Sequence, residues 1–290
     1  MKTKILVCCH KESKLPKDEK YFPIHVGKAL SNMDFGIEGD DTGDNISLKN
    51  GSYCELTGMY WAWKNLKGVD IIGLCHYRRF FDFHHQCDAF FPVTSFPVND
   101  YDKVNLSIPD DMLSKLDDKT VIVASPTVYN MSLYADYCCH HVADDFNTFQ
   151  HVLLQKGNKS YSDAFFNVMY RNNKLRHYNM FIMTWDLFDN YCKWLFGVLG
   201  EVEEKCDISN YSIEQQRIYG YIGERLLNVY IEANKLKTIE KKVIWFNDSV
   251  SKKRNPLVYL FRSWMYSLGL SLTYPQNLVL RDVIHPLEKP

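Results

Sequence analysis

A short cationic stretch, CHYRRFF at residues 75–81, is the part of the sequence best suited to bind a phosphate group. It follows directly on a strand that we predict over residues 70–74. An arginine is always charged, and its planar guanidinium binds phosphate oxygens through two parallel hydrogen bonds. Adjacent side chains on an extended backbone face opposite ways, so we expect one of Arg78 and Arg79 to bind a diphosphate and the other to brace the loop. His76 either donates to the leaving phosphate or is a core histidine with its own partner.

An acidic loop at residues 40–47 is the second polar segment that could bind a ligand. It reads DDTGDNIS, so Asp40, Asp41 and Asp44 form a cluster like the D-x-D motif. Carboxylate oxygens are the ligands that hard divalent cations prefer, which makes a metal site one interpretation. Aspartate, asparagine and glycine are also the residues that turns use, so turn formation alone explains the pattern. A third interpretation is that Asp44 and Asn45 hydrogen-bond a ribose, a uracil or a sugar hydroxyl.

Three further residues are candidates for proton transfer. His141 and Asp145 are four apart in a segment that we predict to be helical over residues 134–154, which would place them on one face. No third ligand accompanies them, so a zinc site is not expected, and a helix-surface pair explains them as well as an acid–base pair does. Glu224 is the other candidate base, although a glutamate beside Arg225 more often belongs to a structural ion pair.

Alternating strand and helix patterns predict an α/β fold around these residues. Apolar runs rich in strand formers predict strands over residues 4–9, 69–74, 121–124, 178–183 and 241–246. Amphipathic spacing predicts helices over residues 53–66, 134–154, 162–170, 185–198 and 214–233. The first strand ends at His10 and Lys11, and the carboxyl ends of strands are where open α/β sheets bind ligands.

Charge and cysteine content exclude several classes of protein. The 290 residues carry 34 basic and 35 acidic side chains, a net charge of -1, so we expect no nucleic-acid partner that relies on bulk positive charge. The nine cysteines include no C-x-x-C motif, and two pairs are direct neighbours, which predicts reduced thiols in the cytoplasm. No stretch approaches the ~20 apolar residues of a membrane span, and no signal peptide is evident.

Several nucleotide and hydrolase signatures are absent from the sequence. It contains no GxxxxGK[ST], no GxGxxG after the first strand, no GxSxG and no HExxH. The interpretations as an NTPase, a classical dehydrogenase, an α/β-hydrolase or a zincin therefore lose their usual support.

The last forty residues differ in character from the rest. Lys252, Lys253 and Arg254 precede an aromatic, amphipathic stretch over residues 256–266. A polybasic segment beside an aromatic face is typical of proteins that lie on an anionic bilayer. We therefore divide the chain into a catalytic domain at residues 1–250 and a tail at residues 251–290, with peripheral membrane contact through residues 252–271. The alternative is a C-terminal helix that docks on its own core.

The chain resembles a family of bacterial capsular and exopolysaccharide proteins, formerly a domain of unknown function and now recognised as galactofuranosyltransferases. Six segments carry the resemblance, in family order over roughly residues 1–245: ILVCCHK at 5–11, DTGDNIS at 41–47, CELTGMYWAWKN at 54–65, GLCHYRRFF at 73–81, NMFIM at 179–183 and RIYGYIGERLLN at 217–228. The resemblance implies a GT-A-like fold with a mixed, mostly parallel sheet flanked by helices. It also implies transfer from a UDP-sugar, with galactofuranose favoured, to a lipid-linked glycan in O-antigen, capsule or exopolysaccharide synthesis.

The resemblance also assigns roles to residues. Most GT-A enzymes hold a divalent cation with a D-x-D motif at the end of the strand that here continues into His76, Tyr77 and Arg78. We therefore predict that the reaction needs no metal, with manganese or magnesium as the alternative. We also predict that the reaction inverts the anomeric centre and takes place at the inner face of the cell membrane. A carboxylate, Asp145 or Glu224, would deprotonate the acceptor hydroxyl, and His141 is the third catalytic candidate. The predicted substrate-binding residues are His10, Lys11, Asp41, Asp44, Asn45, His76, Tyr77, Arg78, Arg79, Asn179 and Arg217.

Two other functions fit the same sequence features. One is a catalytically inactive nucleotide-sugar- or glycan-binding subunit of a polysaccharide assembly complex. The other is a phosphotransferase that acts on polysaccharide and would label its acceptor with phosphate and not with hexose.

Overall fold

The computed structural model describes residues 1–248 and 255–269. Ten strands form one mixed sheet, and a separate pair, β8 and β9, forms a small second sheet. The strands are β1 Thr3–Cys9, β2 Tyr21–His25, β3 Glu38–Gly39, β4 Ile71–His76, β5 Arg79–Phe81, β6 Val93–Phe96, β7 Thr120–Ala124, β8 Thr127–Val128, β9 Lys174–Leu175, β10 Phe181–Thr184, β11 Lys237–Lys241 and β12 Val243–Phe246. The α-helices are α1 Asn50–Tyr53, α2 Leu56–Asn65, α3 Asp110–Leu113, α4 Leu133–His140, α5 Ala143–Gln155, α6 Lys159–Tyr170, α7 Trp185–Glu203, α8 Ile218–Ala233 and α9 Pro256–Gly269.

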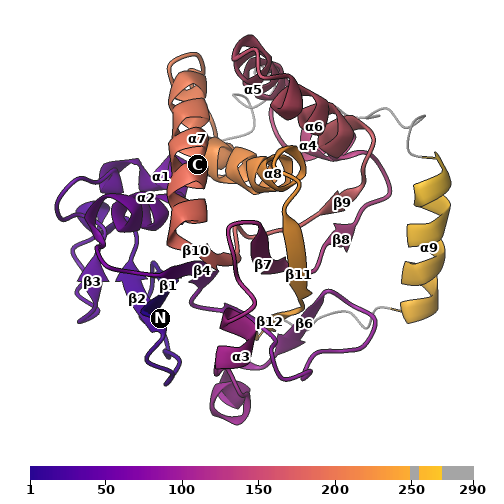
Figure 1. The fold of residues 1–290 in the computed structure, drawn as a ribbon. Helices are drawn as coiled ribbons and strands as arrows, with labels where there is room; N and C mark the ends of the chain where they lie inside the picture. Colours follow the sequence, from indigo (N-terminus) through magenta and orange to yellow (C-terminus); the bar gives the residue numbers. More distant parts are fainter. Residues whose placement is uncertain (249–254, 270–290) are drawn as a thin grey trace.

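The main sheet confirms the predicted mixed, mostly parallel α/β architecture. Its principal order is β11-β7-β10-β4-β1-β2-β3, and β5, β6 and β12 extend it beside β4. Strand β1 pairs parallel with β2 and β4, whereas β10 runs antiparallel between β4 and β7. Figure 1 shows the helices α7 and α8 and the group α4–α6 on one side of the principal strands, with α3 and the added strands β6 and β12 on the other.

Alternate side chains of the strands pack into two separate hydrophobic cores, one on each face of the sheet. On β1, Leu6 and Cys8 face the helices, whereas Ile5, Val7 and Cys9 face the layer that contains α3 and β12. The neighbouring cysteines therefore point to opposite faces, as a strand requires. All nine cysteines are free thiols.

A glycine in β4 allows the central strands to approach closely. A Cβ at Gly73 would lie 2.7 Å from Ile5 Cδ1 and 2.8 Å from both Ile182 Cγ1 and the Phe181 carbonyl oxygen. These contacts are shorter than van der Waals distances, and two of the three partner residues belong to the adjacent strand β10. Only a residue without a side chain fits at the centre of the sheet.

Two helices that we predicted as continuous are broken. The predicted helix over residues 53–66 is interrupted at Cys54, whose φ of 52° is left-handed, so α1 and α2 are separate. The predicted helix over residues 134–154 ends at His140, and the extended residues His141 and Val142 separate α4 from α5. The prediction that His141 and Asp145 share one helical face is therefore wrong.

Other boundaries shift by a few residues. The predicted strand over residues 178–183 begins only at Phe181, because the two residues Tyr178 and Asn179 have left-handed backbones. The predicted strand over residues 241–246 is mainly β12, and the short strands β2 and β3 were not predicted. No helix in the described ranges is long and apolar enough to cross a bilayer.

Candidate functional site

The carboxyl ends of β1 and β4 bring several predicted binding residues together. His10 follows β1, and His76 ends the adjacent parallel strand β4. The rings of His10 and Tyr77 meet edge to face at 5.0 Å, and His10 Nε2 lies 3.5 Å from the Tyr77 hydroxyl. Residues that are 67 positions apart in sequence therefore share one edge of the sheet, where open α/β sheets bind ligands.

This edge of the sheet is electropositive. The pKa of His10 is lowered to about 4, first by desolvation and then by nearby basic groups, among them the positive charges of Lys11, Arg217 and Arg78. A cation is disfavoured where other cations already lie close, so the same surroundings favour an anion. We call Lys11, Arg78 and Arg217 the cationic group; His10, with its lowered pKa, is neutral beside them.

The two adjacent arginines have different surroundings. Arg78 is exposed, and its guanidinium lies 5.2 Å from the centre of the Tyr77 ring. The guanidinium of Arg79 lies between two rings, 4.5 Å from Tyr178 and 5.3 Å from Trp245. Arg78 is thus free to contact a ligand, whereas Arg79 stacks between parts of the protein.

A glutamate that the sequence analysis did not single out faces the same edge. Glu55 precedes α2, and its Oε1 accepts a 2.7 Å hydrogen bond from Asn179 Nδ2 and lies 3.9 Å from His76 Nε2. Its only sequence signal was its place in the segment at residues 54–65, where the predicted helix over residues 53–66 hid the break before Leu56. Nothing in that segment indicates which residues lie opposite the carboxylate.

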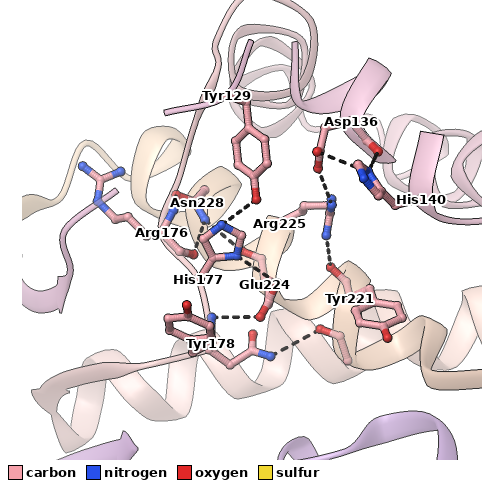
Figure 2. A network of polar contacts seen from close by, with 12 residues as sticks. Tyr129, Asp136, His140, Arg176, His177, Tyr178, Tyr221, Glu224, Arg225 and Asn228 are labelled. Carbon is pink, nitrogen blue, oxygen red and sulfur yellow. Dashed lines mark hydrogen bonds and ion pairs between the residues drawn. The ribbon is translucent and has the colours of Figure 1, made fainter. Parts of the chain in front are cut away.

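Glu224 is held by the residues that precede β10 (Figure 2). Its Oε1 accepts a 2.8 Å hydrogen bond from the Tyr178 N–H, and its Oε2 lies 3.5 Å from His177 Nδ1. Burial alone raises the pKa of Glu224, but the hydrogen bond and charge of His177, the charge of Arg225 and the Tyr178 N–H together lower it to about 2. His177 is itself held at Nε2, 2.7 Å from the Tyr129 hydroxyl. Glu224 is therefore a firmly ionised carboxylate.

Between the two glutamates lies a turn with an unusual backbone. Tyr178 and Asn179 have φ values of 72° and 50°, a conformation that costs roughly 1–3 kcal/mol for a residue other than glycine. Three side chains hold the turn. Glu224 accepts from the Tyr178 N–H, and His76 Nε2 lies 2.7 Å from the Tyr178 carbonyl oxygen. Glu55 accepts from the side-chain amide of Asn179. Strained backbone held in this way is concentrated at functional sites.

The carbonyl contact also fixes the proton on His76. A carbonyl oxygen only accepts, so His76 Nε2 carries the hydrogen and donates to Tyr178. Burial lowers the pKa of His76 and outweighs the opposing effect of Glu55, while Arg79 lowers it further. His76 is therefore neutral and serves here as a positioning residue for the turn.

Arg217 completes the cationic group from the side of α8. Its Nε donates to Cys54 Sγ at 3.3 Å, and its guanidinium lies 5.4 Å from the centre of the Tyr221 ring. Burial and the nearby charge of Glu55 raise the pKa of Cys54 to about 12, so this thiol stays protonated. Arg217 thus retains its full positive charge.

The acidic loop lies elsewhere. Asp40 is fully buried and accepts from the N–H groups of Gly27 and Lys28 and from the Ser47 hydroxyl. The Asp44 carboxylate accepts from the Tyr60 hydroxyl at 3.2 Å, and the Asp44 N–H donates to Asn65 Oδ1 at the C-terminal end of α2, whereas Glu55 precedes the N-terminus of that helix. The loop residues therefore form turn contacts and do not join the cationic group.

Internal contacts of the loop occupy its other predicted ligand-binding residue. Asn45 Nδ2 donates to the carbonyls of Asp41 and Gly43, and its Oδ1 accepts from the Ser47 N–H. The Asp41 side chain is exposed. Within the described residues, no group of three or more His, Cys, Asp or Glu side chains is placed to hold a metal ion.

The remaining candidates lie in the helical layer. Asp145 is only 1% exposed and accepts a 2.9 Å hydrogen bond from the Tyr211 hydroxyl, so an acceptor sugar has no access to it. His141 stacks on Tyr221 with ring centres 4.0 Å apart, and burial followed by the charge of Arg225 lowers its pKa to about 3. Both placements are those of structural residues.

Arg225 does not pair with its neighbour Glu224. Its Nη2 donates to Asp136 Oδ2 at 3.2 Å, and its Nη1 donates to the Tyr221 carbonyl at 3.0 Å. The side chains of Arg225 and Asp136 are 3% and 7% exposed. Figure 2 shows this pair next to the contacts of Glu224: Arg225 and Glu224 come from the same helix α8, and Asp136 comes from α4.

Comparison with known proteins shows a family whose model matches the chain and a solved structure to which the chain is similar. The model of a family described as "Domain of unknown function (DUF4422)" matches residues 4–235. The apo structure of WbbM, a bifunctional glycosyltransferase, is similar to this chain with a TM-score of 0.72 and 28% sequence identity. The similarity covers 88% of this chain and 48% of the WbbM chain, so this chain spans about half the length of WbbM. No curated protein sequence matches.

Proposed function

This chain belongs to the DUF4422 family, and we propose that it is a glycosyltransferase of polysaccharide synthesis. The observation that carries the proposal is the cationic group at the ends of β1 and β4, which faces the carboxylate of Glu55 across one edge of the sheet. A transferase that uses a nucleotide sugar needs both features, because it must bind a diphosphate and deprotonate a hydroxyl. The fold shared with a glycosyltransferase of known structure supports this reading.

The donor that we propose is a UDP-sugar, with galactofuranose favoured, and the acceptor is a lipid-linked glycan. As UDP departs, negative charge develops on its β-phosphate, and fixed positive groups lower the energy of that transition state. Arg78, with its exposed guanidinium, and Arg217, which stays charged, are the residues placed for this role. We propose that they replace the metal ion of other GT-A enzymes and that the reaction inverts the anomeric centre.

A donor screen tests the proposal. We expect the purified protein to transfer a hexose from UDP-galactofuranose to a synthetic lipid-linked acceptor, and to act more slowly on UDP-galactopyranose and UDP-glucose. The product mass and the released UDP are the measurements. Turnover of UDP-glucose or UDP-N-acetylglucosamine without turnover of either UDP-galactose form would contradict the donor assignment.

Two other outcomes of the same screen would contradict the activity itself. A phosphate-labelled acceptor would identify a phosphotransferase. Binding of UDP-sugars without release of UDP from any donor would identify an inactive binding subunit.

We also propose that α9 holds the protein on the inner face of the cell membrane. Its residues Leu257, Val258, Leu260, Phe261, Trp264 and Met265 are 45–75% exposed. At 100° per residue they occupy one side of the helix, whereas Tyr259 lies on the opposite side and contacts Phe91 at 5.3 Å. An apolar stripe that faces solvent favours an interfacial helix over one docked on its own core. The basic residues 252–254, and residues 270 and 271, lie outside the described ranges.

Vesicle binding tests the membrane contact. We expect sedimentation with vesicles that contain anionic lipid, and a loss of about fivefold in partitioning for each of Lys252, Lys253 and Arg254 replaced by alanine, since each charge contributes about 1 kcal/mol. Phe261→Ser should weaken binding independently of salt. Equal binding by the full chain and by a form that ends at residue 250 would contradict the proposal.

A further inference from the structure

The geometry points to Glu55 as the catalytic base of the transfer reaction: we propose that its carboxylate removes the proton of the acceptor hydroxyl. This inference rests on the proposed function. It differs from the sequence-based candidates, because Asp145 is buried in the core and Glu224 is occupied by other contacts.

The backbone places Glu55 at the edge of the sheet. Cys54, at φ 52° and ψ −131°, ends α1 and redirects the chain so that α2 starts directly after Glu55. The Glu55 side chain does not cap its own helix. It reaches instead across to His76 at the end of β4 and to Asn179 in the turn before β10. Glu55 thus stands at the N-terminal, positive end of the α2 dipole.

One oxygen of Glu55 remains available. Oε1 accepts from Asn179 and lies near His76, whereas no donor within residues 1–248 and 255–269 hydrogen-bonds to Oε2. The side chain keeps 11% of its surface in solvent. An acceptor hydroxyl can therefore reach this oxygen, while the hydrogen bond from Asn179 keeps the carboxylate in place.

The second carboxylate at the turn keeps 17% of its side-chain surface in solvent, but both of its oxygens have partners. Oε1 of Glu224 is bound by the Tyr178 N–H, and Oε2 lies against His177. A carboxylate with a pKa of about 2 is also a weak base, because efficient bases have pKa values near the working pH. Glu224 is thus a positioning residue that holds the Tyr178 backbone.

Glu55 lies next to the group that we propose to bind the diphosphate. Its charge acts on Arg217, whose Nε bonds to the adjacent Cys54, and it faces His76 on the strand that leads to Arg78. The reaction is balanced with these groups alone. The hydroxyl proton passes to Glu55, the acceptor oxygen bonds to the anomeric carbon, and the bond from that carbon to the diphosphate oxygen breaks. The electron pair leaves on the β-phosphate, opposite the arginines.

The test is a comparison of three glutamine variants of the full chain. Glu55→Gln keeps an oxygen that can accept from Asn179, so we expect normal folding and UDP affinity but a loss of about 10²–10⁴-fold in kcat. Glu224→Gln retains an acceptor for the Tyr178 N–H and should lose less than tenfold. Glu232→Gln, at an exposed position on the same helix α8, is the matched control and should retain full activity. Product formation, UDP affinity and thermal unfolding are measured on each.

The outcomes separate this inference from the proposed function. If the wild-type protein transfers sugar and Glu55→Gln keeps more than a tenth of its kcat, Glu55 is not the base. A loss of 10²-fold or more in Glu224→Gln with activity retained in Glu55→Gln would assign the base to Glu224. If Glu55→Gln fails to fold, Glu55→Asp is the deciding variant, because it keeps the carboxylate but shortens its reach. We expect this variant to bind UDP normally and to have a low kcat. A wild-type protein that transfers no sugar from any donor would overturn the proposed function itself.

Discussion

Arg78→Ala is expected to lower kcat for sugar transfer about 10²–10³-fold and to leave the fold intact. Arg78 is exposed at the end of β4 and belongs to the cationic group that lowers the pKa of His10. Without the Arg78 guanidinium, the departing diphosphate loses two hydrogen-bond donors directed at its developing negative charge. The measurement is kcat at saturating donor, with thermal unfolding as the test of the fold.

Three further variants serve as controls for the prediction on Arg78. Arg78→Lys should recover only part of the activity, because an ammonium cannot form the bidentate contact. Arg79→Ala should also lower activity, but with a loss of stability, since Arg79 stacks between Tyr178 and Trp245. Arg171→Ala, an exposed arginine at the end of α6, should behave as wild type. Wild-type kcat in Arg78→Ala would contradict the role of Arg78.

The same measurement of kcat, made on the wild-type protein in excess EDTA, tests whether the reaction needs a divalent metal ion. We expect full activity, because the cationic group already supplies the positive charge at the diphosphate. Activity that is abolished by EDTA and restored by manganese would contradict this and would direct attention to the exposed aspartates of the acidic loop, Asp41 and Asp44.

Arg225→Met is expected to lower the free energy of unfolding by about 3–5 kcal/mol. The substitution takes the arginine from the buried Asp136, which keeps only the contact of its Oδ1 with His140 Nδ1 at 3.4 Å. It also removes the donor to the Tyr221 carbonyl and the stacking over Tyr137 at 4.8 Å. A buried charge without compensation is among the most destabilising changes in a core. Urea unfolding at neutral pH is the measurement.

Two comparison variants separate burial from ion pairing. Lys193→Met breaks an exposed pair with Asp189 and should cost about 0–1 kcal/mol. The double variant Arg225→Met/Asp136→Leu removes both buried charges and should recover most of the lost stability. A cost below about 1 kcal/mol for Arg225→Met alone would show that the buried pair contributes little.

Features that depend on nearby residues were predictable from the sequence. The apolar runs that end at Cys9 and Leu74 locate β1 and β4, and the polar residues that follow them do meet at one edge. Period-two alternation predicted the opposite faces of Cys8 and Cys9. Each of these inferences needs only a few neighbouring residues and the rule that the carboxyl ends of parallel strands share one edge.

Features that depend on tertiary contacts could not be predicted from the sequence. Glu55 acquires its surroundings from His76 and Asn179, which are distant in sequence and meet it only in the folded sheet. Helical periodicity continues past His141, although the backbone there is extended and stacks the ring on Tyr221. The left-handed pair Tyr178 and Asn179 contradicts local preference, because contacts from three other segments hold it.

The position of β10 in the sheet has a consequence for biosynthesis. Strand β4 ends at His76, yet β10, which pairs antiparallel along most of its length, begins only at Phe181, and in the described sheet β10 lies between β4 and β7. At 5–20 residues per second, a ribosome takes roughly 5–20 s to make the intervening chain. For that interval the nascent protein carries the edge of a strand that is fully central in the finished fold. Such an unpaired apolar edge is a template for aggregation, so the emerging first half of the chain is the part that most needs protection by chaperones.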